Sequence, residues 1–234
     1  MAEAFSAALD LILSGDAELA AIIALSLRVS LTALAIACAL GLPLGAVLAV
    51  ARFPGRGALV VALNTLMGLP PVVAGLLVYL LLSRSGPLGG LGLLFTPGAM
   101  VVAQTVLILP IVASLTRQVS EELWAEYGEQ LRSLGSSPLR AVPTLLWDGR
   151  HALLTGILAG FGRAMAEVGA VIIVGGNIAG HTRTMTTAIT LETARGNLAL
   201  AVGLGIVLMA LALAVNAAAH LAGRRARRMA GVAA

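Results

Sequence analysis

Two oppositely charged side chains, Arg163 and Glu167, lie four residues apart in an otherwise apolar stretch of the sequence. In a helix this spacing places both residues on one face, where a guanidinium and a carboxylate can form an ion pair. If the stretch spans a membrane, such charges are costly, and they commonly mark a substrate or ion pathway. The residues themselves leave two roles open: a neutralised pair that fixes helix packing, or a polar gate that contacts an anion.

A segment rich in hydroxyl and basic side chains follows, GGNIAGHTRTMTT at residues 175–187. Its glycines interrupt the helical pattern, and its threonine hydroxyls can donate hydrogen bonds without carrying charge. His181 and Arg183 add donors suited to a dianion, although an external loop with a short Thr-rich helix explains the same pattern. His181 has no second ligand at metal-binding spacing, so no metal site is expected. The candidate anion-pathway residues are Arg163, Glu167, Asn177, His181, Thr182, Arg183 and Thr186.

The composition indicates which solvent surrounds these residues. The chain has 234 residues, 59% of them hydrophobic and 11% charged, with a mean hydropathy of +0.99. A soluble domain carries about 25% charged residues, so this surface is predicted to face lipid. The net charge of +4 comes from dispersed arginines without interleaved aromatic residues, which argues against a nucleic-acid partner.

Five stretches are long and apolar enough to cross a bilayer, which needs about 20 residues per helix. The first would reach about 45 Å as a helix, so it is expected to be tilted, kinked near Pro43 or partly outside the lipid. Phe5, Leu9, Ile12 and Leu13 precede it at helical spacing and suggest a short interfacial helix, with a frayed tail as the alternative. The five predicted spans are residues 22–51, 58–82, 98–115, 152–174 and 198–221.

The distribution of arginines predicts the orientation of these spans. With five spans, ten of the fifteen arginines fall on the side that carries residues 117–151 and the C-terminus. Because cytoplasmic loops are enriched in basic residues, that side is predicted to be cytoplasmic and the N-terminus to lie outside.

Residues 117–151 form a charged island between two apolar spans. Within it Leu123, Tyr127, Leu131 and Leu134 make one apolar stripe at helical spacing. Gly135 suits a helix end, and Ser137-Pro138 suits the start of a new helix. The island is therefore predicted to form a helix, a tight turn and a short helix, which either docks a soluble partner or lies on its own membrane domain. Its nine charged residues are Arg117, Glu121, Glu122, Glu126, Glu129, Arg132, Arg140, Asp148 and Arg150.

The island resembles the cytoplasmic E-A-A-x-x-x-G loop of ABC importer permeases, with Glu129 and Gly135 at its two ends. Gln130 and Leu131 stand where that family has small residues. In the family this loop docks into the ATPase subunit and transmits its motion. The resemblance implies an ATPase-coupling loop at residues 117–151, with the coupling residues Glu126, Glu129, Gln130, Leu131, Gly135, Ser136, Pro138 and Pro143.

Residues 160–192 resemble the permeases of molybdate and tungstate importers, and their sequence is closer to the tungstate branch. The matching positions are Arg163, Ala164, Glu167, Gly169, Ala170, Gly176, Asn177 and Ile178. The resemblance implies an all-α integral membrane protein with the type I ABC importer permease fold, as a single permease domain over residues 1–234. It also implies two copies of the chain, two ATP-binding subunits, an external oxyanion-binding protein and a place in the cytoplasmic membrane. Molybdate or sulfate remain alternatives to tungstate as the cargo.

Motifs for enzymatic chemistry are missing from the sequence. It contains no G-x-x-x-x-G-K-[ST], so ATP hydrolysis is expected in a partner subunit and no cofactor is expected here. It contains no H-E-x-x-H and no G-x-S-x-G. An intramembrane enzyme and a passive channel are the alternatives from other classes; a channel would not need a docking loop.

Overall fold

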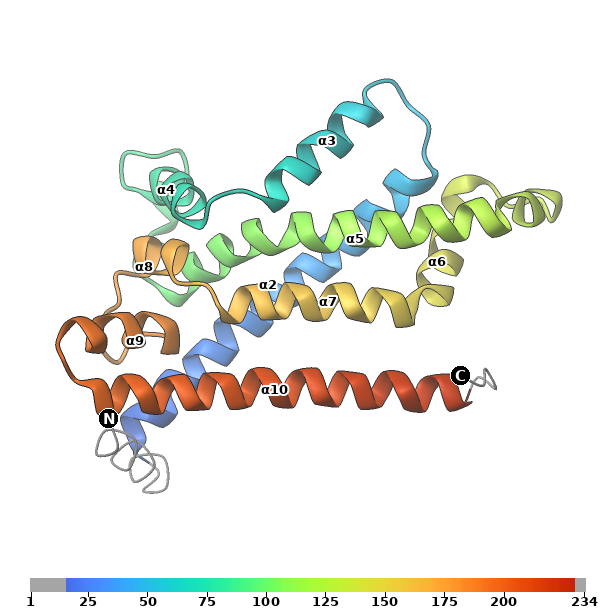
Figure 1. Cartoon of the computed structure of the whole chain (residues 1–234). Helices are drawn as coiled ribbons and strands as arrows, with labels where there is room; N and C mark the ends of the chain where they lie inside the picture. Colours follow the sequence, from blue (N-terminus) through green and yellow to red (C-terminus); the bar gives the residue numbers. More distant parts are fainter. Residues whose placement is uncertain (1–15, 230–234) are drawn as a thin grey trace. The chain divides into compact units, whose positions relative to one another are not determined.

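The computed structural model describes residues 16–229, with side chains to residue 218, and these residues form helices without a strand (Figure 1). This confirms the predicted all-α class. The predicted interfacial helix at Phe5 to Leu13 lies outside the described residues. The helices are α2 (Ala17–Val50), α3 (Arg56–Met67), α4 (Pro71–Leu82), the 3₁₀ turn η1 (Gly89–Leu91), α5 (Pro97–Ser133), α6 (Pro138–Asp148), α7 (Arg150–Met165), α8 (Gly169–Gly175), α9 (Met185–Ala194) and α10 (Leu198–Met229).

Three of these helices are long and apolar enough to cross a membrane: α2, α5 and the first 21 residues of α10. Two bent pairs, α3 with α4 and α7 with α8, could each make one further span, which gives up to five. The predicted number of spans agrees with this upper value. The prediction that residues 58–82 and 152–174 are continuous helices is wrong, because each contains a break.

The first break, between Met67 and Pro71, follows from two consecutive prolines. A residue that precedes a proline is disfavoured in helical conformation, and this applies to both Leu69 and Pro70. Pro71 instead occupies the first turn of α4, where its missing N–H costs nothing. The second break, at residues 166–168, has a different cause and belongs to the candidate site.

The third span also differs from its prediction. Helix α5 runs without interruption from Pro97 to Ser133, so the first helix of the charged island is the end of a spanning helix. Helix α2 likewise runs through Pro43 to Val50. The turn after α5 and the short helix α6 agree with the helix, turn and helix predicted for the island.

The chain divides into two compact units. Among the described residues, the first comprises 16–33, Pro70–Gln104 and Gly162–Val215, and the second comprises Leu34–Leu69, Thr105–Phe161 and 216–229. In the first unit α4 packs closely on α8, since a Cβ built on Gly75 would lie 2.7 Å from the Cα of Ala170. Glycine at position 75 therefore sets how closely these two short helices approach.

The second unit is held by two pairs of small residues at which helices approach closely. Gly41 and Gly45 of α2 face α5, where a side chain at Gly45 would overlap the carbonyl oxygen of Ala113. Gly156 and Gly160 of α7 also face α5, and a Cβ at Gly160 would lie 2.9 Å from Ile108. Both pairs confirm that the missing side chains let the spanning helices come together.

Substitution of Gly75 by alanine should destabilise the protein, because the added methyl group overlaps the backbone of α8. Overpacking of this kind costs about 1–3 kcal/mol. Gly57 in α3 has no atom within 4 Å of its built Cβ, so Gly57→Ala is the matched control and should be neutral or slightly stabilising. Thermal unfolding of the purified protein measures both, and equal unfolding temperatures for the two variants would contradict the packing assignment.

Candidate functional site

The buried carboxylate of Glu167 lies in the break between α7 and α8 and is 2% exposed. Its Oε2 pairs with the guanidinium of Arg163, and its Oε1 accepts a hydrogen bond of 2.9 Å from the backbone N–H of Ala170. The predicted pair therefore exists. The predicted single helix face is wrong, since α7 ends at Met165 and Glu167 is not helical.

The break leaves both partners in favourable positions relative to the helix dipoles. Arg163 occupies the last turn of α7, where a positive charge is stabilised, and Glu167 caps the first turn of α8, where a negative charge is stabilised. In an unbroken helix the amide of Ala170 would bind the carbonyl four residues earlier and could not bind the carboxylate. The break thus supplies a hydrogen bond that a buried carboxylate needs.

The end of α7 is capped by a side chain from another spanning helix. Gln104 of α5 is 3% exposed and donates from Nε2 to the carbonyl oxygen of Ala164 at 3.1 Å. The same oxygen accepts from the backbone N–H of Glu167 at 3.2 Å. A carbonyl that would be unsatisfied at a helix end within an apolar environment therefore has two donors.

The start of α9 joins the same cluster through threonine hydroxyls. Thr184 and Thr187 form a reciprocal capping box, and Thr186 donates from Oγ1 to the carbonyl oxygen of Glu167 at 2.7 Å. The backbone N–H of Met185 donates to the hydroxyl of Ser26 in α2 at 2.8 Å. Four helices and the break therefore meet in one buried polar cluster of the first unit.

The cluster lines a small, partly open cavity of about 10 Å³. This volume has room for a single water-sized molecule and is too small for an oxyanion with four oxygen atoms. Arg163 keeps 30% of its side chain exposed although its partner is buried. An anion could therefore reach Arg163 only from the exposed side of the guanidinium, outside the cavity.

The other predicted pathway residues build the loop between α8 and α9. Thr182 donates from Oγ1 to the carbonyl oxygen of Gly175 at 2.5 Å, and Asn177, in left-handed conformation with φ 50°, donates to the carbonyl oxygen of Thr187 at 3.3 Å. Arg183 lies 3.4 Å from the carboxylate of Glu18, while His181 is exposed. The predicted set thus separates into Arg163, Glu167 and Thr186 in the cluster and four residues in this loop. The described residues hold no group of three potential metal ligands.

The second unit carries the hairpin of α5 and α6. Gly135 adopts φ 81°, a left-handed conformation that favours glycine, and the N–H of Ser136 donates to the carbonyl oxygen of Leu131 at 2.9 Å. Ser137 caps α6 by accepting from the N–H of Arg140 at 3.4 Å, and Pro138 occupies its first turn. The turn residues predicted from the sequence therefore form the turn.

Helix α6 is amphipathic, but its exposed face is not simply polar. Ala141, Val142 and Leu145 are buried against the end of α2. Leu139 and Trp147 are 60% and 69% exposed and lie with Pro143 on the other face. Large apolar side chains on an exposed face typically mark a binding surface. Sequence analysis selected Pro143 but missed Leu139 and Trp147, although their helical spacing was readable.

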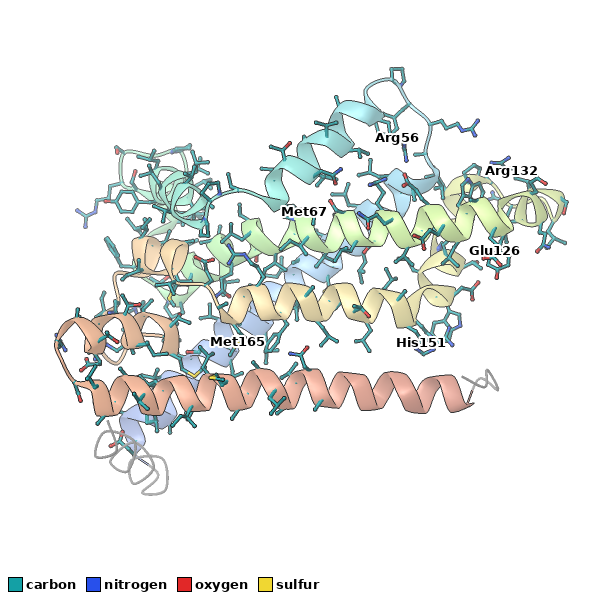
Figure 2. The ribbon with its side chains drawn as sticks, viewed as in Figure 1. Arg56, Met67, Glu126, Arg132, His151 and Met165 are labelled. Carbon is teal, nitrogen blue, oxygen red and sulfur yellow. The ribbon has the colours of Figure 1, made fainter. Side chains whose placement is uncertain are left out.

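Most of the predicted coupling residues are exposed. Figure 2 labels one of them, Glu126, near the end of α5. Leu131 packs on the α6 core, but Tyr127 and Leu134 of the predicted apolar stripe are 38% and 82% exposed, so the stripe is only half buried. Glu126, which hydrogen bonds with Tyr127, raises the pKa of that phenol. The remaining predicted residues that are exposed are Glu126, Glu129, Gln130, Gly135, Pro138 and Pro143, while Ser136 is half-buried.

A charge network at the start of α3 was missed by the sequence analysis. The carboxylate of Glu121 pairs with both Arg117 and Arg56, and Arg56 also donates to the carbonyl oxygen of Leu48 at 2.7 Å. Arg117 and Glu121 are four residues apart, so the rule that found Arg163 and Glu167 could have found them. The link to Arg56 spans 65 residues and has no local signal.

The two halves of the Arg163–Glu167 pair should differ in their contribution to stability. Arg163→Ala leaves a fully buried carboxylate without its counter-ion, a loss of up to about 3–5 kcal/mol. Glu167→Ala leaves a partly exposed guanidinium, so it should cost less, and the double variant should recover part of the Arg163→Ala loss. A double-mutant cycle on unfolding temperature measures this. Strictly additive losses would contradict the pair.

Comparison with known proteins identifies the class to which this arrangement belongs. Residues 41–228 match the family model described as the inner membrane component of binding-protein-dependent transport systems. The chain is 40% identical over 217 residues to the tungstate uptake system permease protein TupB of Peptoclostridium acidaminophilum, covering 93% of this chain and 95% of that protein. It is 42% identical to a probable anion ABC transporter permease protein of Haloferax volcanii, covering 85% and 88%.

Sulfate permeases are more distant relatives. The sulfate transport system permease protein CysW of Synechocystis is 31% identical over 210 residues, covering 85% of this chain and 75% of that protein. All of these relatives are named as permease proteins of uptake or transport systems. With the matched region covering most of the chain, and with helices that can span a membrane several times, the chain belongs to the family of inner membrane components of binding-protein-dependent transport systems.

Proposed function

We propose that the chain is the permease subunit of an ATP-driven importer for a tetrahedral oxyanion, with tungstate as its cargo. The observation that carries this proposal is the 40% identity to a tungstate uptake permease over 95% of that protein's length. The resemblance of residues 160–192 to the tungstate branch supports the same cargo.

The anion pathway is proposed to pass the exposed side of Arg163. Glu167 neutralises this guanidinium through one of its nitrogen atoms, and the exposed part of the side chain would bind and release an anion. Because the cavity is too small for the cargo, the pathway is proposed to run along the surface of the chain and to be completed by a second copy. His181, which is exposed, and Arg183 would contact the anion at the outer entrance, while the buried Thr182 holds the loop in shape.

The partners are two ATP-binding subunits on the cytoplasmic side and an oxyanion-binding protein outside. ATP hydrolysis takes place in those partner subunits, since no P-loop occurs in this sequence. The whole chain acts as one permease domain, with residues 117–151 as the coupling loop. The N-terminus lies outside and the C-terminus in the cytoplasm, as the arginine distribution favours.

Coupling is proposed to use the exposed side of the α5–α6 hairpin. Glu129, Gln130 and the apolar side chains Leu139 and Trp147 are all accessible there. The buried face of α6 packs on the end of spanning helix α2, so a force on the exposed face is transmitted to the membrane part through a close-packed contact.

Sulfate is the second candidate cargo, because the chain is 31% identical to a sulfate permease over most of its length. Both anions are tetrahedral dianions, so charge alone does not distinguish them. A passive channel is a third possibility, and ATP-independent flux through the purified chain would favour it.

Cells that carry the complete importer should take up tungstate in preference to sulfate. Uptake of radiolabelled tungstate should persist with a 100-fold excess of sulfate and fail when ATP is depleted. Competition by sulfate at an equal concentration would favour the second candidate, and uptake that survives ATP depletion would favour the channel. Cells that lack this chain but express its partners are the control.

Charge reversal on the hairpin should uncouple ATP hydrolysis from transport. Glu129→Arg and Trp147→Ala alter exposed side chains, so the protein should still fold and insert, while tungstate-dependent ATP hydrolysis and uptake should fall at least tenfold. Arg84→Glu, at an exposed residue of the loop after α4, is the matched control. Normal uptake in both hairpin variants would remove the hairpin from the ATPase contact.

The proposed orientation can be measured by cysteine labelling in intact cells, after Cys38→Ala removes the one native cysteine. Ser136→Cys in the hairpin turn should resist a membrane-impermeant thiol reagent, because that turn is cytoplasmic. Ser85→Cys, in the exposed loop after α4, should react. Labelling of Ser136→Cys without labelling of Ser85→Cys would reverse the orientation.

A further inference from the structure

The cavity beside Glu167 is lined by polar groups that are nearly all inaccessible to solvent. Its six polar lining residues are each at most 8% exposed. One of their atoms, Oε1 of Gln104, has no hydrogen-bond partner among the described residues, although Nε2 of the same amide is bound. Such an orphaned acceptor is costly in an apolar environment. The six residues are Ser26, Ser30, Gln104, Glu167, Thr184 and Thr186.

The hydroxyl protons of Ser26, Thr184 and Thr186 are already used within the protein. Ser26 donates to the carbonyl oxygen of Ile22 at 2.7 Å, and Thr186 donates to that of Glu167. The hydroxyl of Thr184 lies 3.3 Å and 3.1 Å from those of Thr186 and Thr187, which leaves its proton shared within this group. Because Oε1 of Gln104 still lacks a donor, the occupant of the cavity must be a hydrogen-bond donor or a cation.

Two features disfavour a cation. The first turn of α9 begins at the cavity wall with Met185, and the positive end of its dipole repels a positive charge. The carboxylate of Glu167 is already neutralised by Arg163 and bound by Ala170, so no charge remains to compensate a cation. A neutral donor the size of the cavity satisfies both constraints.

We infer that the cavity binds one water molecule, which donates a hydrogen bond to Oε1 of Gln104 and a second to another lining hydroxyl oxygen. The volume of about 10 Å³ matches a single water. This water completes the polar contact between α5, the end of α7 and the start of α9. The site stands independently of the proposed cargo, since it needs no anion.

An experimental structure of the full transporter that resolves ordered waters tests the site directly. It should contain one density peak within about 2.6–3.2 Å of Oε1 of Gln104. The peak should have the same height in sodium and in rubidium chloride. A higher peak in rubidium chloride would show that the occupant is a monovalent cation and not water. That result, or an empty cavity, would overturn the inference.

A solution measurement tests the same occupant without high resolution. A cation that binds the folded state would raise the unfolding temperature with its concentration. The unfolding temperature of the full transporter in detergent should therefore be equal in sodium, lithium and choline chloride at the same ionic strength. A higher unfolding temperature in sodium chloride alone would show that a cation occupies the cavity and would overturn the inference.

A double-mutant cycle tests whether the cavity is wet. Ser30→Thr adds a methyl group that displaces the water. Oε1 of Gln104 is then left without a hydrogen-bond donor, so the substitution should lower the unfolding temperature. The same change should have a smaller effect in a Gln104→Met background, because methionine has no amide oxygen that needs a donor. Ala24→Val, at an exposed position of α2, controls for the introduction of a β-branched side chain into this helix. A dry cavity would gain packing from Ser30→Thr, and an unchanged or higher unfolding temperature would overturn the inference.

Discussion

The first unit depends on one constraint: a carboxylate buried in an apolar region must find partners for its charge and its lone pairs. Glu167 is 2% exposed, and removing a carboxylate from water is costly unless it is paired and hydrogen-bonded. Arg163 supplies the charge and the amide of Ala170 supplies a hydrogen bond. The amide is free only because the helix stops before Glu167, so the break is a consequence of burying the charge.

The break in turn determines what its neighbours must do. An interrupted helix in lipid leaves free carbonyl groups, and each must be satisfied within the protein. Gln104 donates to the carbonyl oxygen of Ala164 before the break, and the hydroxyl of Thr186 donates to that of Glu167 within it. Short helices then need close packing to remain in place, which the contact of Gly75 with Ala170 provides for α8. The described part of the second unit is held by apolar packing between glycine faces and by the α6 core, and its paired carboxylate, Glu121, stays partly exposed.

The sequence predicts features that are encoded locally. Span number follows from apolar run length, and the hairpin turn follows from Gly135 and Ser137-Pro138. The pair of Arg163 with Glu167 was predicted correctly, but from an assumed continuous helix. The helix break at Pro70-Pro71 could have been predicted from the two prolines, but a count of apolar stretches overlooked it.

Other features depend on contacts between distant positions and leave no local pattern. Gln104 binds a carbonyl 60 residues away, and Ser26 binds an amide 159 residues away. Their only sequence signal is a polar side chain in an apolar span, which indicates importance without indicating a partner. The break at residues 166–168 could not be predicted because it depends on these contacts and not on a helix-breaking residue.

The most direct test of the account is amide hydrogen exchange on Glu167→Ala compared with the native protein. If the buried carboxylate organises the first unit, protection should fall together in Gly169–Gly175 and Met185–Ala194, beginning with the amide of Ala170. Protection in Pro138–Asp148 of the second unit should stay the same. Unchanged protection in α8 and α9, or an equal loss throughout the chain, would contradict the account.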